Sequence, residues 1–201
     1  MVITPPALPG SPVGLLSQEQ LQQLAVAQLA SRKIRRAVAV ATFDGWTLAI
    51  FAALSFVCGL SSISGILMGI GMGVVAWIEL CGARQLRRLN AQAAKRLGFN
   101  QIALALLLIL YAIGSLWSEW RGEGVMAALS AADPAAAGLL KPMEGLAHLL
   151  AMTVYGSLIG VAIVVQGGTA WFYFTRIKHI QGYLEQTPAW IIQMQKADIS
   201  L

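Results

Sequence analysis

The chain has 201 residues, of which 57% are hydrophobic and only 11% are charged, and its mean hydropathy is +0.68. Soluble domains typically contain about 25% charged residues. The charge deficit therefore excludes a disordered chain, a coiled coil and a nucleic-acid-binding domain with a dense basic face. Two cysteines and 20 glycines also exclude a disulfide scaffold and a collagen. The composition predicts an integral membrane protein.

Four apolar stretches have the length of membrane-spanning helices, because about 20 apolar residues cross a hydrocarbon core of about 30 Å. The tract over 38–83 holds two spans joined by a turn near 61–65, and 101–120 and 146–174 supply the third and fourth spans. Asn100 stands before the third span as its expected N-cap. The predicted fold class is an all-α integral membrane protein, a four-transmembrane-helix bundle built from two helical hairpins.

Two segments next to the spans have the pattern of amphipathic helices. Residues 1–37 comprise a lead rich in Pro and Gly and then a helix that starts with a capping-box pattern at Ser17 and Gln20. Residues 84–100 predict a basic amphipathic helix that ends at Gly98. Either helix is expected to lie on the membrane surface, and the alternative for the first is a platform for a partner or for self-assembly.

The two remaining segments are a loop and the C-terminus. Residues 121–145 predict an external loop with a short helix that starts at Asp133-Pro134. Residues 175–201 predict an interfacial or inter-subunit segment that is interrupted by Pro188. At the other terminus, the first residues lack a basic region and an early apolar run, so we expect no cleavable signal peptide.

The basic residues predict the orientation of the chain. Twelve of the 14 Lys and Arg residues flank the spans on the side of 1–37, 84–100 and 175–201. Positive residues collect on the cytoplasmic side, so we expect cytoplasmic N- and C-termini in a bacterial-type inner (plasma) membrane. The residues expected to contact anionic lipid are Arg32, Lys33, Arg35, Arg36, Arg84, Arg87, Arg88, Lys95 and Arg96.

Asp44 in the first span and Glu79 in the second are a candidate intramembrane acidic pair. Both lie about 26 Å from the turn at Ser62 along their helices, and therefore at matched depth near the inner interface. An ionisable residue in a span is a functional hypothesis by default, because its burial is costly. The alternative is an interfacial pair that is neutralised by one of the nearby arginines, Arg35, Arg36, Arg84 or Arg176.

Glycines spaced four residues apart mark two of the spans. They are Gly65, Gly69 and Gly73 in the second span and Gly156 and Gly160 in the fourth. Such a spacing makes a flat helix face that another backbone can approach closely. We therefore expect helix packing and self-association into a homo-oligomer, with packing inside one chain as the alternative.

No combination of residues predicts catalysis. The two histidines and the two cysteines are each expected on opposite sides of the membrane, and no phosphate-binding loop or nucleophile motif occurs. We expect no enzyme activity, no cofactor, no metal site and no nucleic-acid partner. The predicted function is a non-catalytic membrane subunit that self-associates and anchors or assembles a partner at the cytoplasmic face. The alternative is a small homo-oligomeric cation-selective pore with Asp44 and Glu79 in an acidic ring at its inner mouth.

Overall fold

The structure is a computed structural model that describes residues 17–60, 63–124, 127, 130–131 and 144–197. This part of the chain is almost entirely helical and contains no strand. Its elements are α1 (Gln18–Cys58), α2 (Ile63–Arg87), α3 (Ala91–Trp120), α6 (Glu144–Val161), the π-helical turn η2 (Ala162–Gln166), α7 (Gly167–Gln186) and α8 (Ala189–Lys196).

Four helical stretches are long and apolar enough to cross a membrane. They are α1, α2, α3 and the continuous run Gly145–Gln186 that joins α6, η2 and α7. This agrees with the four predicted spans and with a multi-pass membrane protein. The predicted lead over 1–14, the turn at 61–62 and the short helix at Asp133-Pro134 lie outside the described residues.

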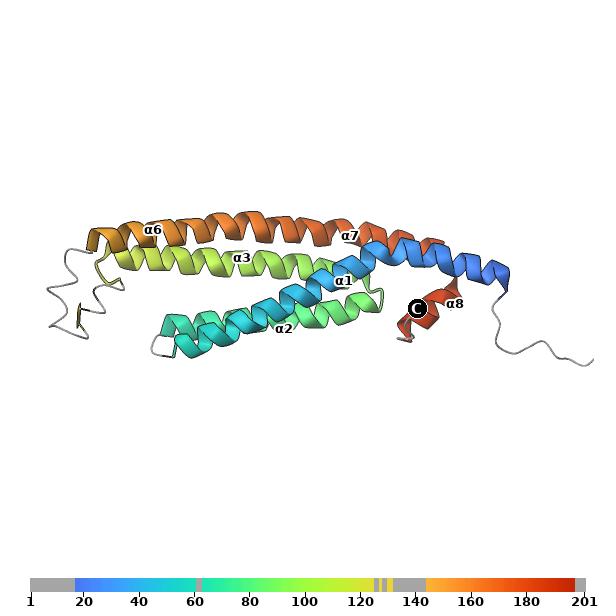
Figure 1. The fold of residues 1–201 in the computed structure, drawn as a ribbon, viewed down its shortest axis with the longest axis horizontal. Coiled ribbons are helices and arrows are strands. Elements are labelled where there is room, and N and C mark those ends of the chain that lie inside the picture. Colours follow the sequence, from blue (N-terminus) through green and yellow to red (C-terminus); the bar gives the residue numbers. More distant parts are fainter. Residues whose placement is uncertain (1–16, 61–62, 125–126, 128–129, 132–143, 198–201) are drawn as a thin grey trace, which may run out of the picture.

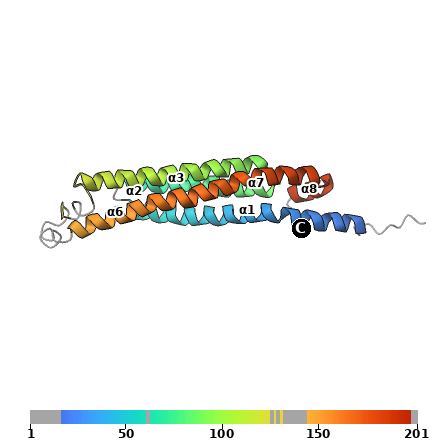
Figure 2. The ribbon, with the colours of Figure 1, turned by 90° about the horizontal axis from the view of Figure 1, so that it is seen from above.

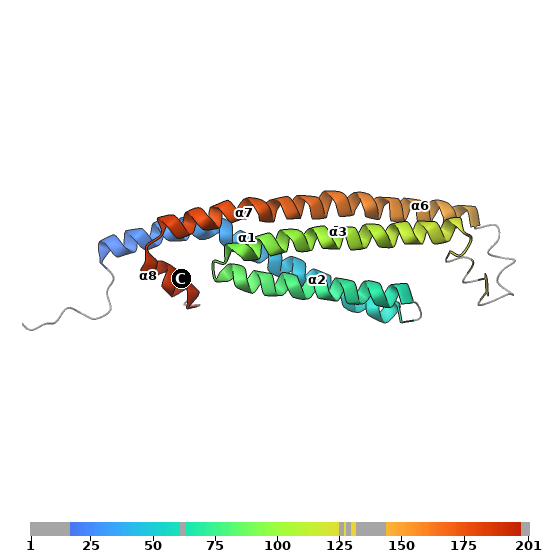
Figure 3. The same ribbon diagram turned by 180° about the vertical axis from the view of Figure 1, so that it is seen from behind.

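The long helices form an elongated bundle in which α3 is central. α1 packs along α2, and α3 contacts α2 on one side and α6, η2 and α7 on the other. Figure 1 shows α3 between the α1–α2 pair and the fourth span, and Figure 3 shows the same order from behind. α1 meets α7 near the described termini, where the view from above also shows α8 (Figure 2).

We call the end of the bundle near the described termini the basic end. It contains the turn between α2 and α3, and the nine predicted lipid-contacting Arg and Lys residues, Arg32, Lys33, Arg35, Arg36, Arg84, Arg87, Arg88, Lys95 and Arg96, are all exposed there. The far end carries Cys58 and Trp120.

The segment predicted as an N-terminal amphipathic helix and the predicted first span form one helix, α1. Ser17 caps it as predicted: its Oγ accepts from the Gln20 backbone N–H at 3.2 Å, and the Gln20 Oε1 accepts from the Ser17 N–H at 2.9 Å. The helix has 41 residues and is therefore about 60 Å long, twice the thickness of a hydrocarbon core. Its N-terminal part extends past the turn between α2 and α3 at the basic end (Figure 1).

The segment 84–100 is not a separate helix, which corrects the sequence-based prediction. α2 ends at Arg87, and the backbone N–H groups of Asn90 and Leu89 donate to Gln85 O (3.2 Å) and Leu86 O (3.0 Å). This is the Schellman pattern of a helix C-terminus, with Leu89 at φ 60° where glycine is usual. The sequence does not reveal this helix end, because such a turn is usually recognised by a glycine at the position that Leu89 occupies here.

The start of the third span is also corrected. Asn90 is the N-cap of α3, since its side chain accepts from the Gln92 N–H at 3.0 Å. Gly98 and Asn100, expected as a C-cap and an N-cap, both lie inside α3 and are buried. The basic residues of this region therefore belong to the ends of two spanning helices that are joined by a tight turn.

The fourth span is longer than predicted and runs to Gln186. The turn η2 widens the helix locally without ending it, and the helix stops only before Pro188, at whose position the sequence predicts an interruption. Only 6% of the residues in its apolar window are buried, against 33 to 39% in the other three spans. The fourth span therefore leaves most of its surface to its surroundings.

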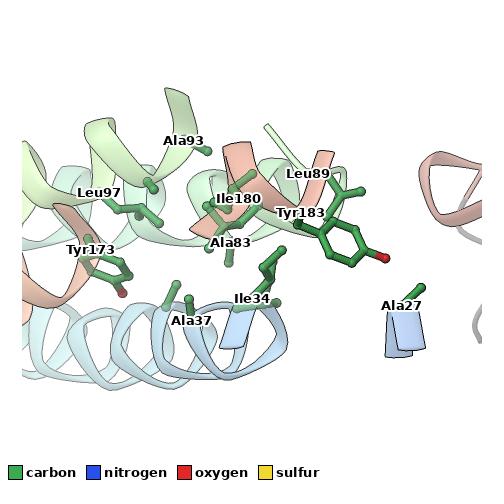
Figure 4. Close-up of a cluster of buried hydrophobic side chains, with 14 of the residues drawn as sticks. Ala27, Ile34, Ala37, Ala83, Leu89, Ala93, Leu97, Tyr173, Ile180 and Tyr183 are labelled. Carbon is green, nitrogen blue, oxygen red and sulfur yellow. The ribbon is translucent and has the colours of Figure 1, made fainter. Parts of the chain in front are cut away.

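Two clusters of buried apolar side chains hold the bundle together. The larger one fills the basic end between α1, α2, α3, α7 and α8, and Figure 4 labels Ala27, Ile34, Ala37, Ala83, Leu89, Ala93, Leu97, Tyr173, Ile180 and Tyr183 in it. The second joins α1, α2 and α3 further along the bundle, through Leu48, Ala52, Met68, Met72, Val75, Ala76 and Leu104. The polar site described next lies between the two.

Candidate functional site

Asp44 and Glu79 meet on one amide group. The Nε2 of Gln101 donates a hydrogen bond to Asp44 Oδ2 and another, 3.2 Å long, to Glu79 Oε1. α1, α2 and α3 thus each contribute one side chain to the same point. The pair that the sequence singles out is brought together through a third residue.

Glu79 has two further hydrogen-bond donors. Asn100 Nδ2 donates to Glu79 Oε2 at 2.8 Å and also to the backbone oxygen of Val75 at 3.0 Å. The Tyr173 hydroxyl, from α7, donates to Glu79 Oε1 at 2.7 Å. Glu79, Gln101 and Tyr173 have no solvent exposure. We call Asp44, Glu79, Asn100, Gln101 and Tyr173 the polar cluster.

Small residues beside the polar cluster let its helices approach closely. A Cβ atom at Gly45 would lie 2.9 Å from the Leu80 side chain. Because glycine has no Cβ atom, α1 can approach α2 closely next to Asp44. At Gly98 a Cβ atom would lie 2.7 Å from the ring of Phe174, which brings α7 close to α3. Larger residues at these two positions would separate the elements that carry the carboxylates from those that carry their donors.

The polar cluster lies within the apolar part of the helices rather than beyond it. Glu79 follows Ile63, the first residue of α2, by 16 positions, and Gln101 precedes Trp120 by 19. These separations correspond to about 24 Å and 28 Å along the helix axes. For a hydrocarbon core of about 30 Å that begins at Ile63 and Trp120, this depth is just inside the boundary on the side of the basic end.

The carboxylates have no cationic partner in the part of the chain that the structure describes. Neither Asp44 nor Glu79 forms an ion pair there. Arg35 instead donates to the backbone oxygen of Gln28, and the Arg176 guanidinium lies over the Phe172 ring, 4.3 Å from its centroid. In the structure, the two acids are thus satisfied by amides and a phenol rather than by the nearby arginines.

One atom of the polar cluster lacks a hydrogen bond. The Oε1 of Gln101 is buried and has no partner among the described residues. Buried polar atoms almost always have a partner, and the unpartnered oxygen belongs to the side chain that joins the two acids. The site therefore consists of two carboxyl groups that share one amide donor, while the oxygen of the same amide accepts no hydrogen bond from the described residues.

The two glycine runs occupy different environments. Gly65 lies against Gly59, where a Cβ atom would come within 2.5 Å of Cα, and Gly69 lies against the backbone of Phe56. These glycines of the second span therefore face α1 of the same chain. At Gly156 and Gly160 a Cβ atom would meet no heavy atom within 4 Å among the described residues.

Gly73, the last member of the run in the second span, also faces α1. A Cβ atom there would lie 3.9 Å from the Cβ of Ala52, which is an ordinary van der Waals distance. A larger side chain is therefore tolerated better at Gly73 than at the two glycines before it.

The sequence did not reveal Asn100, Gln101 and Tyr173 as partners of the acidic pair. The sequence predicts Asn100 as an N-cap and position 101 as the start of a span, and nothing in it pairs Tyr173 with the two acids. Their signal was depth, because 100–101 and 173 lie near the same end of their spans as Asp44 and Glu79. This signal can be used only when it is known which faces of the helices point toward one another.

A recess at the basic end is the second feature of interest. It has a volume of about 460 Å³ and lies between the start of α1 and the α7–α8 junction. Its lining is rich in amide and apolar groups and includes Glu19, Gln22, Gln23, Val26 and Gln186.

No protein-family model, no curated protein and no solved structure matches this chain.

Proposed function

We propose that the chain is a non-catalytic membrane subunit that self-associates through its fourth span and holds a partner at the cytoplasmic face of a bacterial-type inner membrane. The observation that carries this proposal is the contrast between the two glycine runs. Gly65 and Gly69 are covered by α1, whereas Gly156 and Gly160 lie on the sparsely buried fourth span with open space beside them. A flat, uncovered glycine face is typical of contacts between membrane helices.

The orientation in this proposal rests on the basic end. Its nine Arg and Lys side chains are exposed and suited to the anionic lipid of a cytoplasmic leaflet. We infer from this that the basic end, with the recess between α1 and the α7–α8 junction, faces the cytoplasm. A reporter enzyme fused to the C-terminus tests the orientation, because a reporter that works only in the periplasm should stay inactive.

Self-association is tested by variants of the fourth span. Gly160→Leu and Gly156→Leu should reduce the assembly size measured by native mass spectrometry in nanodiscs, because each inserts a bulky side chain into the close contact. Val154→Leu is the matched control, since this residue is already large and is 52% exposed on the same helix. An assembly of unchanged size in both glycine variants contradicts self-association through this face.

Partner binding is tested at the recess. Gln22→Arg and Gln186→Arg place a charge in its lining, and each should remove a co-purifying protein without changing the size of the homo-oligomer. Phe51→Leu, on the exposed surface of the first span, should keep the partner. Equal recovery of the partner in all variants would place its binding elsewhere.

The alternative proposal, a cation-selective pore, has less support. An acidic ring requires the carboxylates to face a space between copies of the chain. Glu79 is instead enclosed by helices of its own chain and has no solvent exposure, so of the two acids only the half-buried Asp44 reaches the surface. Cation conductance in liposomes that is lost in the pair Asp44→Asn and Glu79→Gln would favour the pore.

A further inference from the structure

The polar cluster contains more negative charge than the side chains around it can balance. α1 contributes Asp44, α2 contributes Glu79, α3 contributes the two amides and α7 contributes the phenol of Tyr173. Apart from the two acids, every polar side chain that the structure places on the cluster is neutral. No ion pair to either acid occurs among the described residues.

Two ionised carboxylates at this position would be costly, because Glu79 is fully buried and Asp44 is half-buried. Their oxygens share one nitrogen, the Nε2 of Gln101, and so lie within about 6 Å of each other. Removing one unpaired charge from water costs several kcal/mol even after relaxation of the protein, and a like charge nearby adds repulsion. Neutral donors reduce this cost, but they do not remove the net charge.

The unused oxygen of Gln101 is an independent sign of a missing ligand. The side chain is fully buried and is directed into the cluster, where its nitrogen contacts both acids, while Oε1 has no partner. A proton on one carboxyl would supply a donor: a turn of the amide would let Nε2 donate to one acid and Oε1 accept from the other. A small metal cation would use Oε1 and the carboxylate oxygens as ligands.

We propose that Asp44, Gln101 and Glu79 form a binding site for one monovalent cation, either a proton or Na⁺, shared between the two carboxyl groups. One positive charge halves the net charge of the site and satisfies the orphan oxygen. No group of three or more His, Cys, Asp or Glu side chains suited to a metal occurs among the described residues, so the donor set matches a single charge better than a divalent ion. This inference holds whether or not the chain self-associates.

The test measures how unfolding depends on the cation. The full chain in mild detergent is unfolded reversibly at a series of Na⁺ concentrations, with choline replacing Na⁺ so that ionic strength is constant, and separately at a series of pH values. A ligand that binds only the folded state changes the unfolding equilibrium constant tenfold for each tenfold change in its concentration, once the site is occupied. A slope of one against Na⁺ identifies Na⁺. A slope of one proton against pH, with stability rising as the pH falls, identifies the proton, because the folded chain then binds one proton more than the unfolded chain.

Variants separate the cluster from other ionisable groups. Glu79→Gln removes one of the two acids and should abolish the slope that the wild type shows, and Asp44→Asn should do the same. Glu185→Gln is the matched control, because Glu185 is an exposed acid on α7, and it should keep the wild-type slope. A wild-type chain whose stability depends on neither Na⁺ nor pH more strongly than that of Glu79→Gln would overturn the proposal.

A direct measurement on the wild type covers the case in which a variant fails to fold. Radioactive Na⁺ in equilibrium dialysis counts bound metal per chain, and infrared spectroscopy detects the carbonyl band of a protonated carboxyl that is shielded from exchange. One Na⁺ per chain, or one such band, supports the site. The absence of both refutes it.

Discussion

The hydroxyl of Tyr173 provides the most direct measure of how strongly the polar cluster holds the fourth span. Tyr173→Phe removes the 2.7 Å hydrogen bond to Glu79 Oε1 and little else, because the ring remains in its buried position. A hydrogen bond to a charged group contributes about 1.5–3 kcal/mol, whereas interhelical polar contacts in a membrane protein average about 0.6 kcal/mol and reach about 1.7. We expect a loss of about 1.5 kcal/mol, near the upper membrane value, since the acceptor is a fully buried carboxyl group.

Tyr183→Phe is the matched control. Its hydroxyl donates at 3.0 Å to Gln195 Oε1, a neutral amide oxygen, and its ring is also buried on α7. We expect a loss of about 0.6 kcal/mol for this variant. The difference of about 0.9 kcal/mol corresponds to roughly a fivefold change in the unfolding equilibrium constant.

The assay is reversible unfolding in mixed micelles with increasing SDS, followed by circular dichroism. A double-mutant cycle with Glu79→Gln isolates the contact, because the coupling energy removes effects that each substitution has alone. We expect a coupling of about 1 kcal/mol between Tyr173 and Glu79. A coupling near zero, or equal losses in Tyr173→Phe and Tyr183→Phe, would refute the view that the carboxyl group anchors α7.

Three further predictions concern packing and turns. Gly69→Ala should destabilise the chain by about 1–2 kcal/mol because the new Cβ lies 2.9 Å from the Phe56 backbone nitrogen, while Gly160→Ala should not, as unfolding in SDS will show. Leu89→Gly should be more stable than Leu89→Ala by about 1 kcal/mol, since both lose the buried side chain but only glycine relieves the φ of 60°; equal midpoints would contradict strain at this turn. Asn90→Ala should cost about 1 kcal/mol and speed amide hydrogen exchange in the first turn of α3, and unchanged exchange would mean that the cap is dispensable.

The spans and the first helix cap were predictable because their signals are local. A window of apolar residues identifies a spanning helix without any knowledge of its neighbours, and the Ser17/Gln20 pair specifies its own hydrogen bonds. The turn at 88–90 was not predicted, since Leu89 adopts a backbone conformation for which glycine is the usual marker. Burial of Leu89 in the basic-end cluster offsets that strain, and burial is a property of the tertiary structure.

The acidic pair was predictable as a pair, but its surroundings were not. Equal distances from one turn place Asp44 and Glu79 at the same depth, and helix geometry alone gives this result. Their partners depend on which faces of α3 and α7 point inward, and the sequence of 100–101 allows a capping role as readily as a buried one. The arginines near the same end of the spans suggest ion pairs with the two acids. In the structure, neutral amide and phenol groups donate the hydrogen bonds instead.

The cation site and the self-association face lie in different parts of the molecule, which makes the two proposals separable. Gly160 precedes Tyr173 by 13 residues, or about 20 Å of helix, and sites more than 7–10 Å apart usually contribute additively. Gly160→Leu should therefore reduce the assembly but leave the cation slope of unfolding unchanged, and Glu79→Gln should remove the slope but leave the assembly size unchanged. If Glu79→Gln also dissolves the assembly, the polar cluster must set the position of the whole fourth span. The glycine face would then depend on the cation, and a single mechanism would replace the two.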